Sequence, residues 1–420
     1  GRRRGRGVVM RTDVIVVGAG PAGLAAAAAL AEAGREVRVI ARGNGFTHWG
    51  PGAVDVLARA AGEPVDRPLD GLARLTKRHP YRLLGDEVVR RALDGFQRFA
   101  AAAGLAYEGS LDQNRQQLTA LGTLRPTCLV PAPAAGRLAG PLAVVGFAGF
   151  RDFAPTLCAR GLRNAGHQTS VHTVALPTWN HERNFTAIDL ARAIDDAGFR
   201  SRLADGLGRA TGDADVAVVP AVLGLATGHE AWADLERRTG TALVEAALVP
   251  PSIPGIRLYA AWLARLRELG VRVQLGFPVT GVEVADGAVT AVVSEGASRP
   301  IVTRCNEVVL ATGGVAGRGI EARRDGSLIE AVAGLPVQGF PERVDYLADR
   351  FLDDHPLGAA GVVVDAELRP LDTAGEPALR GLRCVGGLLA DHDPTAEGSR
   401  EGVALATATR VAERLATAPV

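Results

Sequence analysis

Residues 11–40 constrain the fold of this chain more than any other stretch. Residues 13–17 end in a β-branched apolar run, which is typical of a strand buried on both faces of a parallel sheet. A helix is predicted over residues 21–33, and a second strand over residues 36–40 follows the stop at Gly34. This order of strand, helix and strand predicts an α/β fold that begins with a β–α–β unit.

Three glycines, Gly18, Gly20 and Gly23, lie between the first strand and the helix. In a dinucleotide-binding turn the first allows the sharp turn, the second lets backbone approach a pyrophosphate, and the third lets helix and strand pack closely. The helix that starts at Pro21, a residue tolerated at this position, directs unpaired N–H groups at an anion. The turn therefore predicts dinucleotide binding; a glycine turn without a ligand is the alternative.

One part of the dinucleotide-binding pattern is missing. An acidic residue that holds the ribose hydroxyls is expected roughly 20 residues after the glycines, at the end of the second strand. That strand ends instead in Ile40, Ala41, Arg42 and Gly43. Arg42 is therefore a candidate to face a phosphate.

Composition narrows the function classes. The 420 residues include 47 basic and 46 acidic side chains, a net charge of +1, so no nucleic-acid surface is predicted. The four cysteines are widely spaced without a CxxC pair, so no metal or iron–sulfur site is predicted, and a reducing cytoplasmic setting is expected. Apolar runs such as residues 216–226 fall short of the roughly 18 residues that a membrane-spanning helix needs.

The arginine-rich residues 1–9 lack the apolar core of a signal peptide. We interpret them as a disordered leader or an over-extended start, with a polybasic lipid contact as the alternative. Further along, a short helix is predicted over residues 53–61 and a longer one over residues 86–103. A stretch rich in Pro, Ala and Gly at residues 131–141 is typical of a boundary.

The α/β pattern restarts at Leu142. Strands are predicted at the start of 144–153, over 169–176 and over 216–222, with helices over 154–165 and 187–211, which indicates a second α/β module inserted into the first. Gly146, Gly149 and Arg151 lack the spacing of a phosphate-binding fingerprint, so we assign them mostly a structural role.

After the insert, a proline-stiffened loop at residues 250–257 precedes a helix over 259–269. Residues 271–296 alternate as a β-meander with a turn at Asp286 and Gly287. The buried strand at 307–314 is expected to return to the first sheet. The predicted domains are a leader at 1–9, the first part of the dinucleotide-binding domain at 10–135, the insert at 136–250, the helix and meander at 251–300, and the return segment of the first domain with a C-terminal helix at 301–420.

Three separated segments together resemble the two-dinucleotide-type flavoproteins. They are GAGPAG at 18–23, LATGG at 310–314, and VGG with GSREGVALA between 385 and 406. The resemblance implies a Rossmann-like flavin-binding domain in which the first segment cradles phosphate, the second covers the nucleotide and the third meets the isoalloxazine. The implied cofactor-binding residues are Gly18, Ala19, Gly20, Pro21, Ala22, Gly23, Arg42, Gly43, Thr312, Gly313, Gly314, Gly386, Gly387, Gly398, Ser399, Gly402 and Val403.

Longer strings resemble the B-subunit of the anaerobic glycerol-3-phosphate dehydrogenase. They are HPYRLLG at 79–85, LGTLRPT at 121–127, VVGFAGFRDF at 144–153 and PPSIPGIRL at 250–258, and the resemblance spans nearly the whole chain from Met10. It implies oxidation of sn-glycerol 3-phosphate to dihydroxyacetone phosphate in a complex with the catalytic A-subunit. An iron–sulfur C-subunit passes electrons to membrane quinone, so this chain is expected in the cytoplasm, peripheral to the membrane through its partner.

The cofactor implied by that family is FMN, which has no ADP half, and the absent ribose-binding acid agrees with it. The glycines suit a pyrophosphate, so FAD is the alternative. For the reaction, Arg125 and Arg257 are candidate phosphate partners, and His48 and His79 are candidate bases.

For each of these four residues an ordinary structural role is the alternative, and His79 before Pro80 is also placed to cap a turn. Two rival functions remain at this stage: a self-sufficient flavin dehydrogenase or reductase of a small acid, and a scaffold protein with a degenerate pocket.

Overall fold

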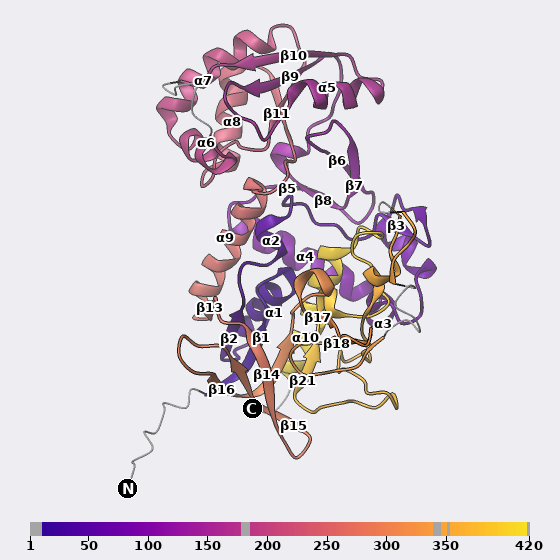
Figure 1. Ribbon diagram of the computed structural model, residues 1–420. Coiled ribbons are helices and arrows are strands. Elements are labelled where there is room, and N and C mark those ends of the chain that lie inside the picture. Colours follow the sequence, from indigo (N-terminus) through magenta and orange to yellow (C-terminus); the bar gives the residue numbers. More distant parts are fainter. Residues whose placement is uncertain (1–10, 178–184, 339–345, 351–352, 418–420) are drawn as a thin grey trace. The chain divides into compact units, whose positions relative to one another are not determined.

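The chain folds into two compact units in the computed structural model, which describes residues 11–177, 185–338, 346–350 and 353–417 (Figure 1). The first unit comprises the chain up to Phe46, residues 55–96 and the chain from Trp262 on, and the second comprises residues 47–54 and 97–261. The second unit thus extends on both sides of the predicted insert at 136–250. The predicted leader at 1–9 lies outside the described residues.

A seven-stranded sheet forms the centre of the first unit. Its central strand β1 pairs in parallel with β2 on one side and with β16 on the other, and β21 pairs in parallel with β16. The predicted return of the chain to the first sheet is confirmed, since Val17 lies opposite Leu310. The strands are β1 Arg11–Val17, β2 Val37–Ala41, β13 Arg272–Leu275, β14 Val279–Ala285, β15 Ala288–Ser294, β16 Ile301–Leu310 and β21 Leu382–Cys384.

The meander after the insert differs in extent from the prediction. β14, β15 and the first part of β16 pair antiparallel, and the turn between β14 and β15 has Asp286 and Gly287 at φ values of 49° and 71°, as a tight hairpin requires. β13 was wrongly assigned to the meander, because it pairs in parallel with β2. Its register follows from a partner far away in sequence, which local alternation does not reveal.

Small side chains allow the helices of the first unit to pack closely. Helix α1 (Pro21–Glu32) has alanine at seven of its twelve positions and buries most of its residues against its neighbours, among them α10 (Arg400–Ala416). Pro21 occupies the start of α1 as predicted. Other elements of this unit are α3 Pro80–Leu84, the short pairs β3 Arg59–Ala60 with β4 Glu63–Pro64, β17 Ile320–Ala322 with β18 Leu328–Glu330, and β19 Val337–Gln338 with β20 Gly361–Val362.

The second unit has its own parallel sheet, in the order β10, β9, β11, β12. Helices α7 and α8 pack together on one side of the strands and α5 lies on the other (Figure 1), so the predicted α/β character of the insert is confirmed. The elements are β9 Leu142–Phe147, α5 Pro155–Asn164, β10 Thr169–Val174, α6 Ala187–Ile194, α7 Ala197–Thr211, β11 Val216–Pro220, α8 Gly228–Thr239 and β12 Ala242–Ala246. The sequence analysis missed α8 and β12.

Two short strand pairs complete the second unit, namely β5 Tyr107–Gly109 with β8 Leu129–Pro131 and β6 Arg115–Leu118 with β7 Leu124–Thr127. The chain passes between the units within α2 (Phe46–Trp49), α4 (Asp86–Ala102) and α9 (Ile253–Glu268), and once more between residues 54 and 55. The predicted helix at 53–61 is wrong: this stretch is extended and ends in β3. The loop predicted at 250–257 is partly wrong, because α9 already begins at Ile253.

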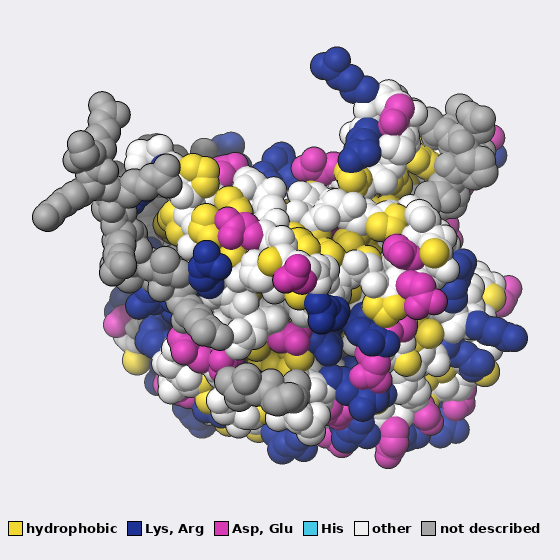
Figure 2. Space-filling model, turned by 90° about the horizontal axis from the view of Figure 1, so that it is seen from below, with side chains coloured by type: hydrophobic (Ala, Val, Ile, Leu, Met, Phe, Trp, Pro, Cys, Tyr) yellow, Lys and Arg dark blue, Asp and Glu magenta, His cyan; other side chains and the backbone are white. Residues whose placement is uncertain are grey.

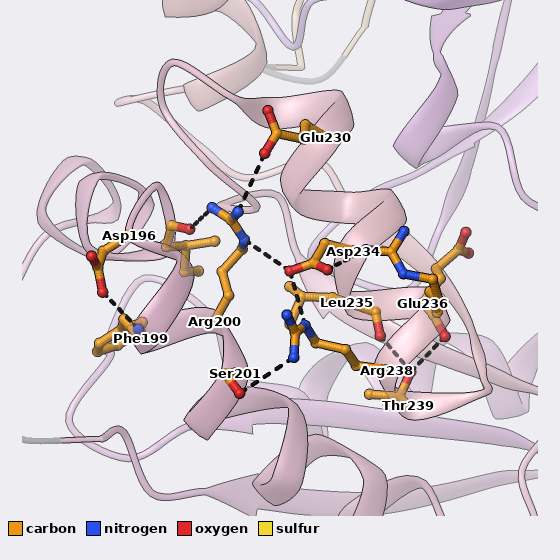
Figure 3. Close-up of polar contacts among 12 residues, drawn as sticks. Asp196, Phe199, Arg200, Ser201, Glu230, Asp234, Leu235, Glu236, Arg238 and Thr239 are labelled. Atoms are coloured by element: carbon orange, nitrogen blue, oxygen red, sulfur yellow. Dashed lines mark hydrogen bonds and ion pairs between the residues drawn. The ribbon is translucent and has the colours of Figure 1, made fainter.

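A buried ionic cluster joins α6, α7 and α8 (Figure 3). Arg200 of α7 is 4 % exposed and donates to Asp234 Oδ2 of α8 at 3.2 Å, and to the carbonyls of Ile194 and Asp195 at 3.0 and 2.8 Å. Asp234 also accepts from Arg238 at 3.0 Å. In this cluster each buried charge has a partner of opposite sign. Arg200 also donates to carbonyls at the end of α6, which have no hydrogen-bond partner within that helix.

On one face of the molecule, side chains of opposite charge are mixed. Figure 2 shows Lys and Arg side chains interspersed with Asp and Glu across one face. This mixture matches the near-balanced net charge of +1.

Candidate functional site

The glycine turn after β1 is built from contacts that exclude side chains. Gly18 has a φ of 117°, and a Cβ there would clash with the carbonyl oxygen of Ala311. A Cβ on Gly23 would clash with the carbonyl of Gly18. These two positions therefore fix how α1 and the end of β16 pack on the turn.

Gly20 differs from the other two glycines. Its φ of −83° suits any residue, yet no heavy atom of its surroundings lies within 4 Å of where a Cβ would stand. Gly20 occupies the N-cap position of α1 but has no side chain to accept a hydrogen bond from the helix N–H groups. The first turn of that helix also carries no acidic residue. Open space beside an uncapped helix N-terminus suits an anionic group such as a pyrophosphate.

The three glycine-rich segments converge in the first unit. Gly314 approaches Gly387, whose carbonyl oxygen would lie 2.8 Å from a Cβ there, and Gly386 has a φ of 68° with the Cβ of Ala22 at 2.7 Å from its own Cβ position. A Cβ on Gly45 would likewise clash with the backbone of Gly20. Segments from both ends of the chain thus meet at the turn.

The start of α10 is equally crowded. Gly402 donates its N–H to the carbonyl of Asp55 at 2.8 Å, and a Cβ there would clash with the hydroxyl of Tyr81. Gly398 has a φ of 60° and packs on Ala58. Ser399 occupies the N-cap position of α10 without a side-chain capping hydrogen bond, and Ser399 and Val403 are fully buried.

All predicted cofactor-binding residues belong to the first unit. Arg42 and Gly43 are exposed beyond the end of β2, where Ala41 is buried. Thr312 has a buried hydroxyl without a hydrogen-bond partner among the described residues. The acidic residue expected to hold the ribose hydroxyls is absent from the end of β2, where the basic Arg42 follows Ala41 instead.

His79 of the first unit is 1 % exposed and is engaged at both ring nitrogens. It caps α3, since its Nδ1 accepts the N–H of Tyr81 at 3.1 Å, and its Nε2 lies 3.1 Å from Glu397 Oε2. This arrangement leaves no nitrogen of His79 to take a proton from a substrate.

The other three predicted residues, His48, Arg125 and Arg257, belong to the second unit. The ring of His48 packs edge-on against Trp49 and Tyr259, burial lowers its pKa, and its Nδ1 is buried without a partner in the described chain. Arg125 is half-buried and donates to Gln117 at 3.0 Å.

Arg257 lies on α9, not on a loop. It donates to the carbonyls of Gly224 and Leu223 at 2.7 and 3.1 Å and lies 3.6 Å from the fully buried Glu245. Burial raises the pKa of Glu245, which Arg257 opposes. Arg257 therefore already has a structural function in the second unit.

Sequence reasoning missed a buried polar group at the carboxyl end of β21. His392 is 2 % exposed, its Nε2 lies 3.0 Å from Ser399 Oγ, and Ser399 donates to Glu397 Oε2 at 2.7 Å. Glu397 also meets His79. The signal was a histidine between the Gly386–Gly387 pair and the Gly398–Ser399 pair.

Comparison with known proteins gives the family. The model of the FAD binding domain family matches residues 13–403. The B-subunit of the anaerobic glycerol-3-phosphate dehydrogenase of Yersinia pestis is 33 % identical, over 97 % of this chain and 98 % of the relative. The protein of the same name from Pectobacterium atrosepticum is 31 % identical over 97 % and 99 %.

The chain belongs to the B-subunit family of the anaerobic glycerol-3-phosphate dehydrogenases. It is part of a flavin-dependent dehydrogenase, as the resemblance implied. Among solved structures, 3-ketosteroid Δ1-dehydrogenase from Sterolibacterium denitrificans is similar over 97 % of this chain and 99 % of its own, with 13 % identity and a TM-score of 0.47.

The cofactor prediction needs correction. FMN as the main choice is not supported, because the matching family is that of the FAD binding domain. The open space over Gly20 and the uncapped start of α1 fit the pyrophosphate that FAD has and FMN lacks. The absence of the acidic residue at the end of β2 favoured FMN. That residue would contact only the ribose hydroxyls, so its absence does not exclude a pyrophosphate.

The B-subunit names of the relatives place this chain in a multi-subunit complex. Within the described residues, none of the helices is both long and apolar enough to span a bilayer. The same part of the chain holds no cluster of three or more His, Cys, Asp or Glu side chains arranged for a metal ion.

Proposed function

We propose that this chain is the FAD-holding subunit of a respiratory glycerol-3-phosphate dehydrogenase that oxidises sn-glycerol 3-phosphate to dihydroxyacetone phosphate. The A-subunit is its catalytic partner, and an iron–sulfur C-subunit at the cytoplasmic face of the membrane passes the electrons to quinone. The observation that carries the proposal is the open space over Gly20 at the N-terminus of α1, in the unit where the three glycine-rich segments converge.

The reaction requires two transfers from the secondary alcohol. The bound flavin supplies a hydride acceptor for the carbon-bound hydrogen, and a protein base takes the hydroxyl proton. Guanidinium groups suit the substrate phosphate because they donate bidentately. Arg125 and Arg257 keep this proposed role, although Arg257 would have to share its guanidinium with two carbonyls.

His48 also remains a proposed base. Its Nδ1 is buried and lacks a partner in the described residues, and its lowered pKa favours the unprotonated form. His79 is disfavoured in this role because Tyr81 and Glu397 occupy its nitrogens.

The test is a flavin determination followed by anaerobic reduction. The chain is purified together with its partner subunits, its visible spectrum is recorded, and the flavin released by denaturation is identified by chromatography. We expect FAD, bleached on addition of glycerol 3-phosphate. Colourless protein would favour the scaffold function that the absent ribose acid allows, and released FMN would contradict the cofactor assignment.

A second purification of the chain alone separates the remaining rival. We expect little turnover with an artificial acceptor in the absence of the partners. Sustained turnover by the isolated chain would instead support a self-sufficient dehydrogenase.

A further inference from the structure

Three buried side chains and the partly buried Glu397 form a continuous hydrogen-bonded chain in the first unit. They run from His79 through Glu397 and Ser399 to His392, with separations of 3.1, 2.7 and 3.0 Å. The rings of the two histidines also lie edge-on, with centroids 5.6 Å apart. All four residues sit on the loop before α10 or on the segment that caps α3.

The hydrogen-bond directions follow from one backbone contact. The N–H of Tyr81 donates to His79 Nδ1, so the proton of neutral His79 is on Nε2 and is donated to Glu397. Ser399 donates its only hydroxyl proton to Glu397, so its oxygen accepts from His392 Nε2. His392 Nδ1 therefore carries an unshared lone pair.

That lone pair has no partner among the described residues, although the atom is fully buried. Buried polar groups are almost always hydrogen-bonded, so the position calls for a donor from a ligand or an ordered water. His392 lies five residues after Gly387, in the segment in which Gly386 meets Ala22 and Gly387 meets Gly314. The acceptor thus belongs to the loop that joins the flavin-site glycines to the start of α10.

We propose that His392 Nδ1, in the same unit as the flavin-site glycines, is the base that takes the hydroxyl proton of the alcohol substrate in place of His48, with Ser399, Glu397 and His79 as positioning residues. The inference deepens the proposed function and rests on it. The O–H bond of the alcohol breaks and an N–H bond forms at His392, while the hydride on the same carbon passes to the flavin. The alcohol is oxidised to the ketone, the flavin is reduced by two electrons, and the proton stays on the imidazole.

The groups around His392 keep its imidazole unprotonated before the reaction. Burial lowers the pKa of His392 to about 3, and the nearby His79 and Arg400 act in the same direction, so Nδ1 is unprotonated at neutral pH. The carboxylate of Glu397 opposes these effects and would stabilise an imidazolium once the proton has arrived. The pKa of Glu397 is itself lowered by its hydrogen bonds, against its burial, so it remains charged.

The test uses His392→Gln in the complex with its partner subunits. A glutamine amide can still donate to Ser399 but offers no acceptor at the Nδ1 position. We expect unchanged flavin content and a rate of flavin reduction by glycerol 3-phosphate that falls about 10²–10⁴-fold, with little change in substrate affinity. His172→Gln is the matched control, because His172 Nε2 also lies beside a serine hydroxyl, Ser170 Oγ at 2.9 Å, in the second unit.

Two outcomes separate the inference from the proposed function. If glycerol 3-phosphate does not reduce the wild-type complex, the proposed function fails and the inference fails with it. If the wild type is reduced and His392→Gln is reduced at the same rate, only the inference fails. The pH profile of flavin reduction distinguishes loss of a base from loss of structure. Without the base, the rate in the variant should rise with pH, whereas the wild-type rate should be flat from about pH 6 to about pH 8.

A second readout does not depend on activity. The reduced complex cannot accept a hydride, so it should hold glycerol 3-phosphate unchanged in a cryo-electron microscopy map. We expect the C2 hydroxyl within hydrogen-bond reach of His392 Nδ1, about 2.6–3.2 Å. A water or a backbone N–H on Nδ1, with the substrate elsewhere, would overturn the assignment.

Discussion

At the scale of single residues, Gly20 separates flavin binding from folding. We expect Gly20→Ala to leave the melting temperature of the flavin-free protein unchanged, because the backbone there suits alanine and a Cβ meets no atom within 4 Å. The methyl group would occupy the space assigned to the pyrophosphate. Flavin affinity should fall at least about tenfold, or about 1.4 kcal/mol, which the ratio of flavin to protein absorbance measures.

Gly208→Ala in α7 is the matched control, since that position is equally open and lies in the second unit. It should retain full flavin. Full flavin occupancy in Gly20→Ala would remove the phosphate site from this turn.

His392 also predicts a pH dependence of stability. Its folded-state pKa of about 3 lies below the value of 6.5 expected in the unfolded chain, so the unfolded state binds the proton first as the pH falls. Stability from this group is complete above about pH 6.5 and is lost toward the folded-state pKa, with a slope of at most about 1.4 kcal/mol per pH unit. Urea unfolding between about pH 6.5 and about pH 4.5 measures it.

The upper part of this window isolates His392 from Glu397, whose lowered pKa makes it titrate below 4.5. His392→Gln removes the titrating ring, so its free energy of unfolding should fall less steeply with acid than that of the wild type. Parallel curves for the two proteins would show that His392 is not buried in the neutral form.

At the scale of elements, the ionic cluster of the second unit predicts a large stability loss. Arg200→Met leaves two carbonyls at the end of α6 and part of the Asp234 charge unpaired inside the protein. We expect a loss of about 2–4 kcal/mol in urea unfolding. Arg237→Met is the control: its side chain is 71 % exposed, so the loss should be about 0.5 kcal/mol or less. Equal losses would argue against the buried cluster.

Elements with local signals were predictable from the sequence. The glycine turn with α1, the long helix α4 and the Asp286–Gly287 hairpin each carry their cause within a few residues. The conformation of residues 53–61, in contrast, depends on partners that are distant in sequence. The N–H groups of Ala58 and Arg59 donate to the carbonyl of Glu397, and Val54 bridges to Leu129. Such distant partners override helix propensity.

The candidate site divides in the same way. Its glycines were found because each backbone constraint has a sequence signature, whereas His79 meets the loop of His392, Glu397 and Ser399 only in three dimensions. The start of α9 could have been found, since Ser252 accepts the N–H of Gly255 at 3.3 Å, a capping pattern visible in the sequence.

At the scale of the whole molecule, the two units have separate cores, and a flavin should stabilise them unequally. The second unit has its own cluster of buried side chains around β9 and β11. All three glycine-rich segments and every predicted flavin contact belong to the first unit. A ligand stabilises only the part whose folded form binds it.

Calorimetry of the chain with and without FAD tests this separation. We expect two transitions, with only that of the first unit raised by FAD, by about 2.7 kcal/mol at a free concentration 100 times the dissociation constant. Arg200→Met identifies the transition of the second unit by lowering it alone, and Gly20→Ala should abolish the FAD-dependent shift while leaving both transitions of the flavin-free chain in place. If FAD raised both transitions together, the second unit would have to contribute to the flavin site or unfold as one body with the first.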